Sequence, residues 1–214
     1  MSGPTPAPRP DSRGERKERT RRAILDAALH LCEDSSLVAL SLRQVAKEVG
    51  IVPTAFYRHF DSIESLGLAL VDESFVSLRA MLRDIRRGDP SYADIVDRSV
   101  ETLHQHVRQQ RSHFLFIARE RAAGPLSVRE AIRHEIELCE RELATDLARL
   151  PGTERWTPED LQILSNLIVT AMVATAEQVM EASGRPGAEK QIVENARTQL
   201  RMVLVGALNW QSRS

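Results

Sequence analysis

The residues best suited to chemistry in this 214-residue chain are basic and hydroxyl side chains near its N-terminus. Residues 9–22 hold seven arginines and lysines against three carboxylates. Guanidinium, ammonium, hydroxyl and imidazole groups are the donors that proteins present to phosphate oxygens. Residues 1–60 carry a net charge of +3, from ten Lys/Arg against seven Asp/Glu, whereas the remainder carries −4. This asymmetry favours a chain with one end that faces a polyanion, although a basic segment of this kind can equally be a solvated tail.

Aromatic residues make up only 4% of the chain, yet three of them cluster with basic ones in the sequence PTAFYRHF, from Pro53 to Phe60. On a helix that begins at Pro53, Phe56 and Phe60 lie four residues apart on one face. We expect these two phenylalanines to anchor the helix to its neighbours. The side chains between them are then held outward in register, where they can meet a nucleic-acid backbone.

Other reactive side chains point to no enzyme and no metal site. The sequence has no GxSxG motif, glycine-rich phosphate loop or Cys-His-acid set. His104 and His106 are two residues apart, so on a helix they face nearly opposite directions and cannot share a metal. The sequence HEIEL at His134 lacks the second histidine of an HExxH site. Cys32 and Cys139 are the only cysteines, which argues against a disulfide framework and favours a reducing cytoplasm.

The N-terminal elements that position the basic residues can be delimited from the sequence. Residues 1–15 contain four prolines and few apolar residues, so we expect a disordered basic arm. Apolar residues at helical spacing predict a first helix from about Glu18 to the EDSS sequence at 33–36. Ser41 with Gln44 has the pattern of a capping box, and Gly50 suits the end of that second helix.

A third helix is predicted from Pro53, which suits a first turn, to Phe60, and Asp61 with Glu64 is predicted to cap the much longer fourth helix. The two short helices within 41–60 have the pattern of a helix-turn-helix, whose second helix enters the DNA major groove. Any pair of short antiparallel helices of this size could imitate that pattern.

The sequences TRRAILDAALHL and LSLRQVAKEVGIVPTAFYRHFDSIESLGLAL resemble the TetR family of bacterial repressors, strongly over residues 18–72 and in helical layout beyond them. Together with ARERAAG at 118–124, they are most similar to the branch that includes FabR and DesT. That branch regulates unsaturated-fatty-acid and desaturase genes in response to long-chain acyl-CoA or acyl carrier. The resemblance implies an all-α fold and a homodimeric repressor that binds a pseudo-palindromic DNA operator in the cytoplasm.

The resemblance also implies roles for individual residues. Arg43 matches a base-reading position, and arginine bidentate to guanine is the commonest specific contact. Thr54 and Ala55 match groove-facing positions, Tyr57 and His59 match phosphate contacts, and Arg58 can reach either a base or a phosphate. The arm residues Arg16, Lys17 and Thr20 are expected to meet the backbone or the minor groove.

The rest of the chain reads as consecutive helices, at 62–86, 91–110, 112–122, 126–149, 158–182 and 188–210. With the first three they make about nine. We therefore predict an arm at 1–15, a helix-turn-helix domain at 16–61, and a ligand-binding and dimerisation domain at 62–214. The most apolar run, at 167–176, is about half of the roughly 20 residues that a membrane span needs.

Apolar residues in the central helices are candidates for an effector pocket, although each of them could equally be ordinary core. An acyl chain requires a long apolar cavity, and Arg119 and Arg121 could attract the phosphates of coenzyme A near its mouth. No metal or cofactor is expected besides this effector, a long-chain acyl-CoA. The candidate lining residues are Leu103, Val107, Phe114, Phe116, Ile117, Ile136, Leu138, Met172, Val173 and Val179.

The last two helices carry small and apolar residues around much of their circumference, which suits a four-helix seam between two subunits. Burial of the same residues inside one protomer is the competing interpretation. The candidate seam residues are Leu164, Ile168, Ala171, Thr175, Ile192, Ala196, Val203 and Ala207.

Two other functions compete with a lipid-responsive repressor. A repressor of the same family could sense a different molecule, such as a drug-like cation or a flat aromatic, but this body has few aromatics for a cation site. A purely structural helical protein is the other alternative. The direction in which an effector shifts DNA binding stays open, because either sign satisfies linkage.

Overall fold

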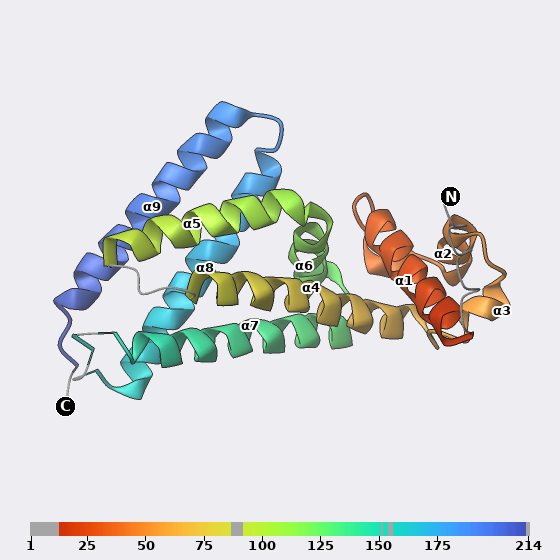
Figure 1. Ribbon diagram of the computed structural model, residues 1–214, viewed down its shortest axis with the longest axis horizontal. Coiled ribbons are helices and arrows are strands. Elements are labelled where there is room, and N and C mark those ends of the chain that lie inside the picture. The colour runs from red at the N-terminus through yellow and green to blue at the C-terminus, as the bar shows by residue number, and fades with distance from the viewer. Residues whose placement is uncertain (1–12, 87–91, 151, 154–155, 213–214) are drawn as a thin grey trace, which may run out of the picture.

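The computed structural model describes residues 13–86, 92–150, 152–153 and 156–212, and regular structure within these ranges is entirely helical (Figure 1). The prediction of an all-α fold with about nine helices is confirmed over this part of the chain. In chain order the elements are α1 (Arg13–Leu31), η1 (Leu37–Ala39), α2 (Leu42–Val49), α3 (Pro53–Phe56), α4 (Ile63–Arg86), α5 (Tyr92–Gln109), α6 (Arg111–Ala123), α7 (Leu126–Leu147), α8 (Pro158–Glu181) and α9 (Pro186–Leu208).

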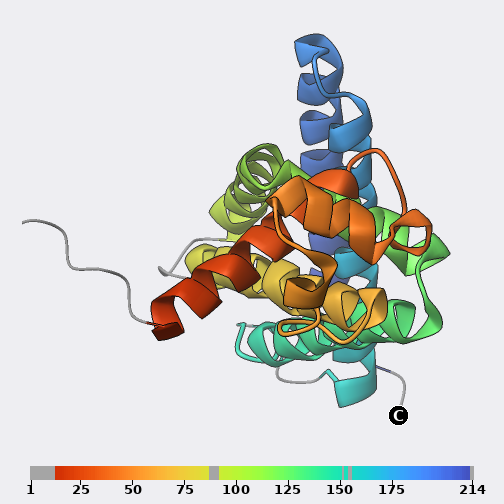
Figure 2. The same ribbon diagram turned by 90° about the vertical axis from the view of Figure 1, so that its right-hand side faces the viewer.

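The helices form a small N-terminal group and a larger body. The group of α1, α2 and α3 lies at one end of the molecule, and the long α4 runs from it into the body (Figure 1). In the body α7 packs on α4, α6 and α8, while α9 packs on α5 and α8. The hairpin of α8 and α9 extends away from the rest of the body, as the view along the long axis shows (Figure 2).

Local chemistry explains the two short helices of the N-terminal group. The Ser41 hydroxyl accepts a hydrogen bond from the Gln44 backbone N–H at 3.2 Å, and the Gln44 side chain accepts one from the Ser41 N–H at 2.8 Å. This is the predicted capping box. Gly50 ends α2 with φ of 77°, a left-handed conformation that a residue with a Cβ disfavours. Pro53 occupies the first turn of α3.

Three predicted boundaries differ from the structure. α1 begins at Arg13, inside the predicted arm, while residues 1–12 lie outside the described part of the chain. α3 ends at Phe56, and residues 57–60 continue as a turn rather than as helix. Ser62 and Ser65 cap the start of α4 by reciprocal bonds between each hydroxyl and the other's backbone N–H, at 3.0 and 3.1 Å, so Asp61 and Glu64 are not the capping pair.

A single apolar cluster joins the N-terminal group to the body. It contains buried residues of α1, α2, α3, η1 and α4, and also Phe116, Val128 and Ile132 of the body. Leu37 of η1 is fully buried in this cluster because Gly67 of α4 lets it approach: a Cβ on Gly67 would lie 2.3 Å from Leu37 Cδ2. The small domain is therefore packed against the body as well as connected to it through α4.

The helix α8 is long and apolar enough, by length and composition, to cross a membrane. Its neighbours in the structure are α5, α6, α7 and α9. Several residues of this helix are buried in the body, including Leu161, Leu164, Ser165 and Val179. These contacts fit an apolar helix that packs inside a helical body.

Candidate DNA-binding surface and effector cavity

In the turn that contains the clustered aromatics, the phenylalanines are buried and several other side chains are exposed. Phe56 is fully buried and Phe60 is 4% exposed, with their ring centroids 5.8 Å apart. The guanidinium of Arg21 lies 4.5 Å from the Phe60 ring centroid, a cation–π contact that fixes α1 against the turn. Tyr57 is 54% exposed, and Thr54 and Arg58 are also exposed. The aromatic anchors therefore hold a set of polar side chains outward, as the sequence predicts.

The other predicted DNA-contacting residues lie on the neighbouring helices or on the same turn. Arg43 is exposed on α2, Ala55 is half-buried on α3, and Arg16 and Lys17 are exposed in the first turns of α1. The Thr20 hydroxyl donates to the Arg16 carbonyl at 2.9 Å. These positions and those of Tyr57 and Arg58 lie on α1, α2 and the turn after α3, which belong to one small domain.

Two arginines of α1 have partners within the fold. The Arg22 guanidinium pairs with Glu73 of α4 at 2.6 Å and with Asp26 at 3.3 Å. Arg22 therefore links α1 to α4, while Arg21 stacks on Phe60. The sequence shows seven basic residues in 9–22 but does not distinguish those with partners in the fold.

His59, which was predicted to contact phosphate, lies close to several basic side chains. It is half-buried, and no partner for its Nδ1 exists within the described residues. Burial lowers the pKa of this imidazole below 6.5, and the nearby charges of Lys17, Arg21 and Arg58 lower it further, against an opposing effect of Glu18. The imidazole thus lies among cations that disfavour its protonation, and a phosphate placed beside it would favour the protonated form.

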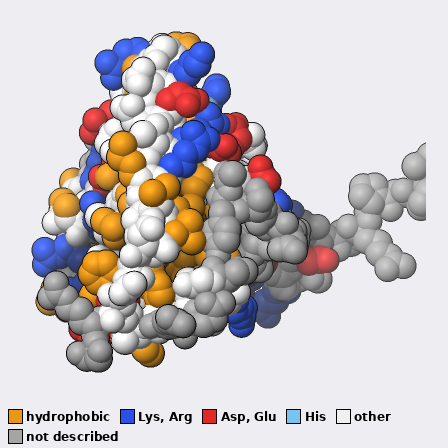
Figure 3. Space-filling view, turned by 90° about the vertical axis from the view of Figure 1, so that its left-hand side faces the viewer, with side chains coloured by type: hydrophobic (Ala, Val, Ile, Leu, Met, Phe, Trp, Pro, Cys, Tyr) orange, Lys and Arg blue, Asp and Glu red, His pale blue; other side chains and the backbone are white. Residues whose placement is uncertain are grey.

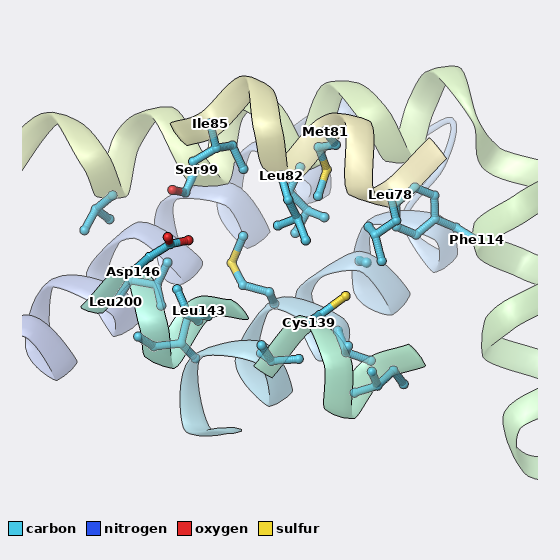
Figure 4. A pocket seen from close by; sticks show the side chains of 18 of the residues that line it. Leu78, Met81, Leu82, Ile85, Ser99, Phe114, Cys139, Leu143, Asp146 and Leu200 are labelled. Carbon is cyan, nitrogen blue, oxygen red and sulfur yellow. The ribbon is translucent and has the colours of Figure 1, made fainter. Parts of the chain in front are cut away.

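The body encloses a cavity of about 580 Å³, within the usual range for small-molecule sites. Side chains of α4 to α9 line it, and Figure 4 shows Met81, Leu82 and Phe114 directed into it from α4 and α6, opposite Cys139 and Leu143 of α7. Apolar side chains dominate the wall. The polar lining residues are Ser99, Arg121, Asp146, Arg149 and Glu177.

The structure brings together seven of the twelve side chains predicted for the pocket. The residues that line the cavity are Leu103, Phe114, Ile117, Ile136, Met172, Val173 and Arg121. Val107 and Val179 belong instead to the packed cluster beside it, and Phe116 is buried in the cluster that joins the two domains. Leu138 is half-buried outside the lining, since α7 presents Ile136, Cys139 and Leu143 to the cavity.

The sequence interpretation missed the wall that α4 provides. Phe75, Leu78, Met81, Leu82 and Ile85 all line the cavity. Their spacing of three and four residues is visible in the sequence and marks one apolar helix face. The sequence analysis placed this helix in the ligand-binding domain but took its candidate lining residues from later helices, so this face was not assigned to the cavity.

The two arginines predicted at the pocket mouth have different positions. Arg121 lines the cavity and pairs with Glu177 of α8 at 3.1 Å, with about a third of each side chain exposed. Arg119 does not reach the cavity. It donates to three backbone carbonyls at the end of α1, those of Cys32, Glu33 and Ser35, at 2.6, 3.0 and 2.7 Å. The prediction of Arg119 as a ligand contact is wrong, because its side chain lies on the opposite face of α6.

The residues predicted for the dimer seam do not lie on the exposed faces of α8 and α9. Leu164, Thr175 and Ala196 are buried within the protomer, and Ile168 lines the cavity. The other predicted seam residues are all half-buried: Val203 and Ala207 pack on the cluster around Leu164, Ile192 packs beside Met180, and Ala171 accepts the Thr175 hydroxyl bond at 2.8 Å.

Neighbouring positions on the same two helices are exposed instead. Apolar side chains gather on the face at which α9 ends (Figure 3). The exposed apolar residues of α8 and α9 are Ile163, Leu167, Met202, Val205 and Leu208, each at least half exposed. We call these five residues the α8–α9 patch. A helix buried on one side and apolar on the other gives no sequence signal that separates the two sides.

Acidic, histidine and cysteine side chains form no group of three able to hold a metal in the described ranges. Cys32 is buried, and burial together with the charge of Glu120 raises the pKa of its thiol to about 12, against a lowering effect of Arg119. Such a thiol is a poor nucleophile.

Comparison with known proteins identifies the N-terminal domain. Residues 24–70 match the bacterial regulatory proteins of the tetR family. Among solved structures, a transcriptional regulator of the TerR/AcrR family from Aquifex aeolicus VF5 is similar over 86% of this chain and 99% of its own, with 17% identity and a TM-score of 0.65. The fatty acid degradation regulator FadR from Bacillus halodurans covers 85% of this chain and 94% of its own, with 13% identity and a TM-score of 0.68.

A third similar structure is GusR from Salmonella enterica, which covers 87% of this chain and 95% of its own, with 20% identity and a TM-score of 0.68. These likenesses extend the fold assignment from the matched domain to the whole body. Sequence identities at this level show a shared fold and do not show which effector is bound.

Proposed function

We propose that this chain, whose residues 24–70 match the tetR family of bacterial regulatory proteins, is a cytoplasmic, homodimeric repressor of fatty-acid genes whose DNA binding responds to long-chain acyl-CoA. Regulators of this family bind DNA operators as dimers, respond to small molecules and are not enzymes. The observation that carries the DNA-binding part is the turn at 53–60, where buried Phe56 and Phe60 hold exposed Tyr57 and Arg58 outward.

We assign operator contacts to the polar surface around this turn. Arg43 is exposed on the helix before the turn and supplies base recognition, while Thr54 and Ala55 face the groove. Tyr57, Arg58, His59, Arg16, Lys17 and Thr20 supply contacts to the backbone. The affinity for operator DNA should fall steeply with salt, because phosphate contacts release counterions. A salt titration of duplex binding tests this assignment, and an affinity independent of salt would contradict it.

The α8–α9 patch supports the dimer. An exposed apolar face on two adjacent long helices is suited to isologous packing against its own copy, and two-fold pairing is the commonest assembly. The substitution Val205→Glu should give a monomer in sedimentation equilibrium. Val76→Glu is the matched control, because Val76 is an equally exposed apolar residue on α4. A dimer unaffected by Val205→Glu would place the interface elsewhere.

Two observations support a fatty-acyl effector. The cavity is predominantly apolar and lined by Met and Phe side chains that adapt to a flexible chain. Arg121 stands at its partly exposed side, where a phosphate of coenzyme A could replace the carboxylate of Glu177. One protein of similar fold bears the name of a fatty acid degradation regulator, which agrees with this class of effector.

Carboxylates in the lining favour a second class of effector. Asp146 and Glu177 both line the cavity, and Figure 4 shows Asp146 directed toward it opposite Ser99. Such groups suit an apolar molecule that carries an amine or a hydroxyl, as a drug or efflux substrate does. This alternative predicts that the effector is a hydrogen-bond donor rather than an acid.

A gel shift on promoter DNA beside the chain's own gene separates the two classes. Saturated and unsaturated acyl-CoAs of several lengths are added to the complex, with apolar amines in parallel. The proposal expects an acyl-CoA to change DNA affinity in the unmodified protein and to lose that effect in Val173→Trp, which fills the cavity. Ala122→Trp, at an exposed position of α6, is the control. No response to any acyl-CoA would remove the lipid effector and leave the repressor.

A further inference from the structure

The polar residues of the cavity lining gather at two separate places in an otherwise apolar wall. Arg121 of α6 and Glu177 of α8 form one place, the ion pair described above. Ser99 of α5 and Asp146 of α7 form the other, and Figure 4 shows Asp146 directed into the cavity opposite Ser99. We call these two residues the Ser99–Asp146 pair.

The two polar places lie at opposite ends of the cavity. Ile168 of α8 packs in the same buried clusters as Leu147 and Val100, the sequence neighbours of the pair, so it marks that end. Glu177 lines the cavity nine residues farther along α8. At the helical rise of about 1.5 Å per residue, this separation is roughly 13 Å. A chain-like molecule that lies along the cavity therefore meets polar groups near both of its ends.

The chemistry of the pair suits a hydroxyl group of a ligand. The Ser99 side chain is half-buried, and no hydrogen-bond partner of its hydroxyl lies among the described residues. A serine hydroxyl can donate or accept a hydrogen bond, whereas an ionised carboxylate only accepts. A ligand hydroxyl between the two side chains can accept a bond from Ser99 and donate one to Asp146.

The charges around the pair disfavour an ionised group at this end of the ligand. The carboxylate of Asp146 is half-buried and lies 3.6 Å from the guanidinium of Arg149, which is largely exposed. The carboxylate repels a second carboxylate, and the guanidinium repels an ammonium group. A methyl end is also disfavoured, because it takes the Ser99 hydroxyl out of water without giving it a partner.

We propose that the Ser99–Asp146 pair is a specificity subsite for a hydroxyl group at the remote end of an acyl chain, so that the preferred effector is a hydroxylated fatty acyl compound. This subsite rests on the proposed function, in that the cavity holds an acyl chain whose coenzyme A lies near Arg121. A cavity that selected unsubstituted chains would be better lined by apolar side chains at both ends, because buried polar groups without partners oppose the binding of an apolar chain.

The test compares coenzyme A thioesters of fatty acids with and without a hydroxyl on the terminal carbon, over a series of chain lengths, by isothermal titration calorimetry of the full chain. At the length that brings the hydroxyl to the pair, the hydroxylated thioester should bind about 10- to 100-fold more tightly, the effect of a hydrogen bond to a charged group. At shorter lengths the hydroxyl lies against the apolar wall, so the hydroxylated thioester should bind more weakly than its unsubstituted counterpart.

Substitutions in the pair should abolish the preference for the hydroxylated chain. In Ser99→Ala and in Asp146→Leu, the unsubstituted thioester should gain affinity while the hydroxylated one loses it. Glu137→Leu is the matched control for Asp146→Leu, because Glu137 is an exposed carboxylate of α7 outside the cavity lining. Arg121→Met should weaken both thioesters by the same factor, because it acts at the coenzyme A end. The ratio of the two affinities is the readout, since partial unfolding of a variant lowers both alike.

Two different failures can be told apart. Equal affinities of the two thioesters at every chain length, or a preference left undiminished by either substitution in the pair, would overturn the subsite and leave the fatty-acyl effector standing. Binding of neither series at any length would contradict the fatty-acyl effector and the subsite with it.

Discussion

Replacement of Gly67 by alanine tests the packing that joins the two domains. Gly67 lies inside α4, where glycine is less stable than alanine by about 0.5–1 kcal/mol, so an unhindered site would gain that amount. Here the new methyl would lie 2.3 Å from Leu37 Cδ2 and 3.0 Å from Val128 Cγ2. Leu37 is fully buried and cannot swing aside. Overpacking of this kind costs about 1–3 kcal/mol.

The overlap therefore outweighs the helix propensity, and Gly67→Ala should lower the free energy of unfolding by ~1–2 kcal/mol. For a chain of this length that corresponds to a fall in Tm of roughly 2–8 °C. Urea denaturation and calorimetry measure both quantities, at one protomer concentration because a dimer's stability depends on concentration.

A second substitution removes the shortest of these contacts. In Leu37→Val the clashing Cδ2 is gone, and the Leu37 Cγ position lies 3.6 Å from the new methyl, an ordinary contact. Because only the 3.0 Å approach to Val128 Cγ2 remains, Gly67→Ala should cost clearly less stability in this background than in the otherwise unmodified protein. Gly187→Ala in α9 is the control, since no atom lies within 4 Å of its new Cβ. Gly67→Ala that stabilises the otherwise unmodified protein would show that Leu37 is not seated against α4 in solution.

Three further predictions concern single side chains. Arg43→Ala should reduce discrimination between the operator and a scrambled duplex by about 1–3 kcal/mol while the fold and dimer remain, as competition gel shifts can measure; full selectivity in this variant would show the assignment wrong. Burial and the charges of Lys17 and Arg21 lower the pKa of His59 in the free protein, and DNA phosphates should raise it. The operator affinity, measured by fluorescence anisotropy, should therefore rise as the pH falls from 8 to 6. The substitution His59→Gln should abolish that rise. Burial raises the pKa of Glu120 above 4.5, so the contribution of this side chain to folding stability is full below pH 4.5 and is lost as the pH rises through the folded-state pKa. The stability of Glu120→Gln relative to the unmodified protein should therefore increase between pH 4 and 8. Urea denaturation that shows a constant difference in stability would contradict this.

The candidate DNA-binding surface was predicted more completely from the sequence than the effector cavity. The exposed turn at 53–60 and its buried anchors followed from the spacing of Phe56 and Phe60 and from the capping of α2 at Ser41. The cavity was predicted in outline from apolar segments, but Phe116 and Val107 proved to be core and the α4 wall was missed. Apolar composition marks a residue as buried and does not say whether its neighbours fill the space around it.

The surroundings of Arg119 and Leu164 likewise could not be predicted from the sequence. The sequence places Arg119 two residues from Arg121, but only the packing of α6 between α1 and α8 shows that one meets backbone carbonyls and the other a carboxylate. Leu164 and Ile163 are adjacent apolar residues of α8, and the contacts of α7 and α9 decide that the first is buried and the second exposed.

The sequence by itself determined the helices, most of their ends and the helix-turn-helix, because helical periodicity and capping depend on residues within about four positions of one another. The tertiary structure alone decided which face of each apolar helix lines the cavity, which is packed and which is exposed. Those choices depend on side chains far apart in the chain, and the packing of α6 against the end of α1 follows from them.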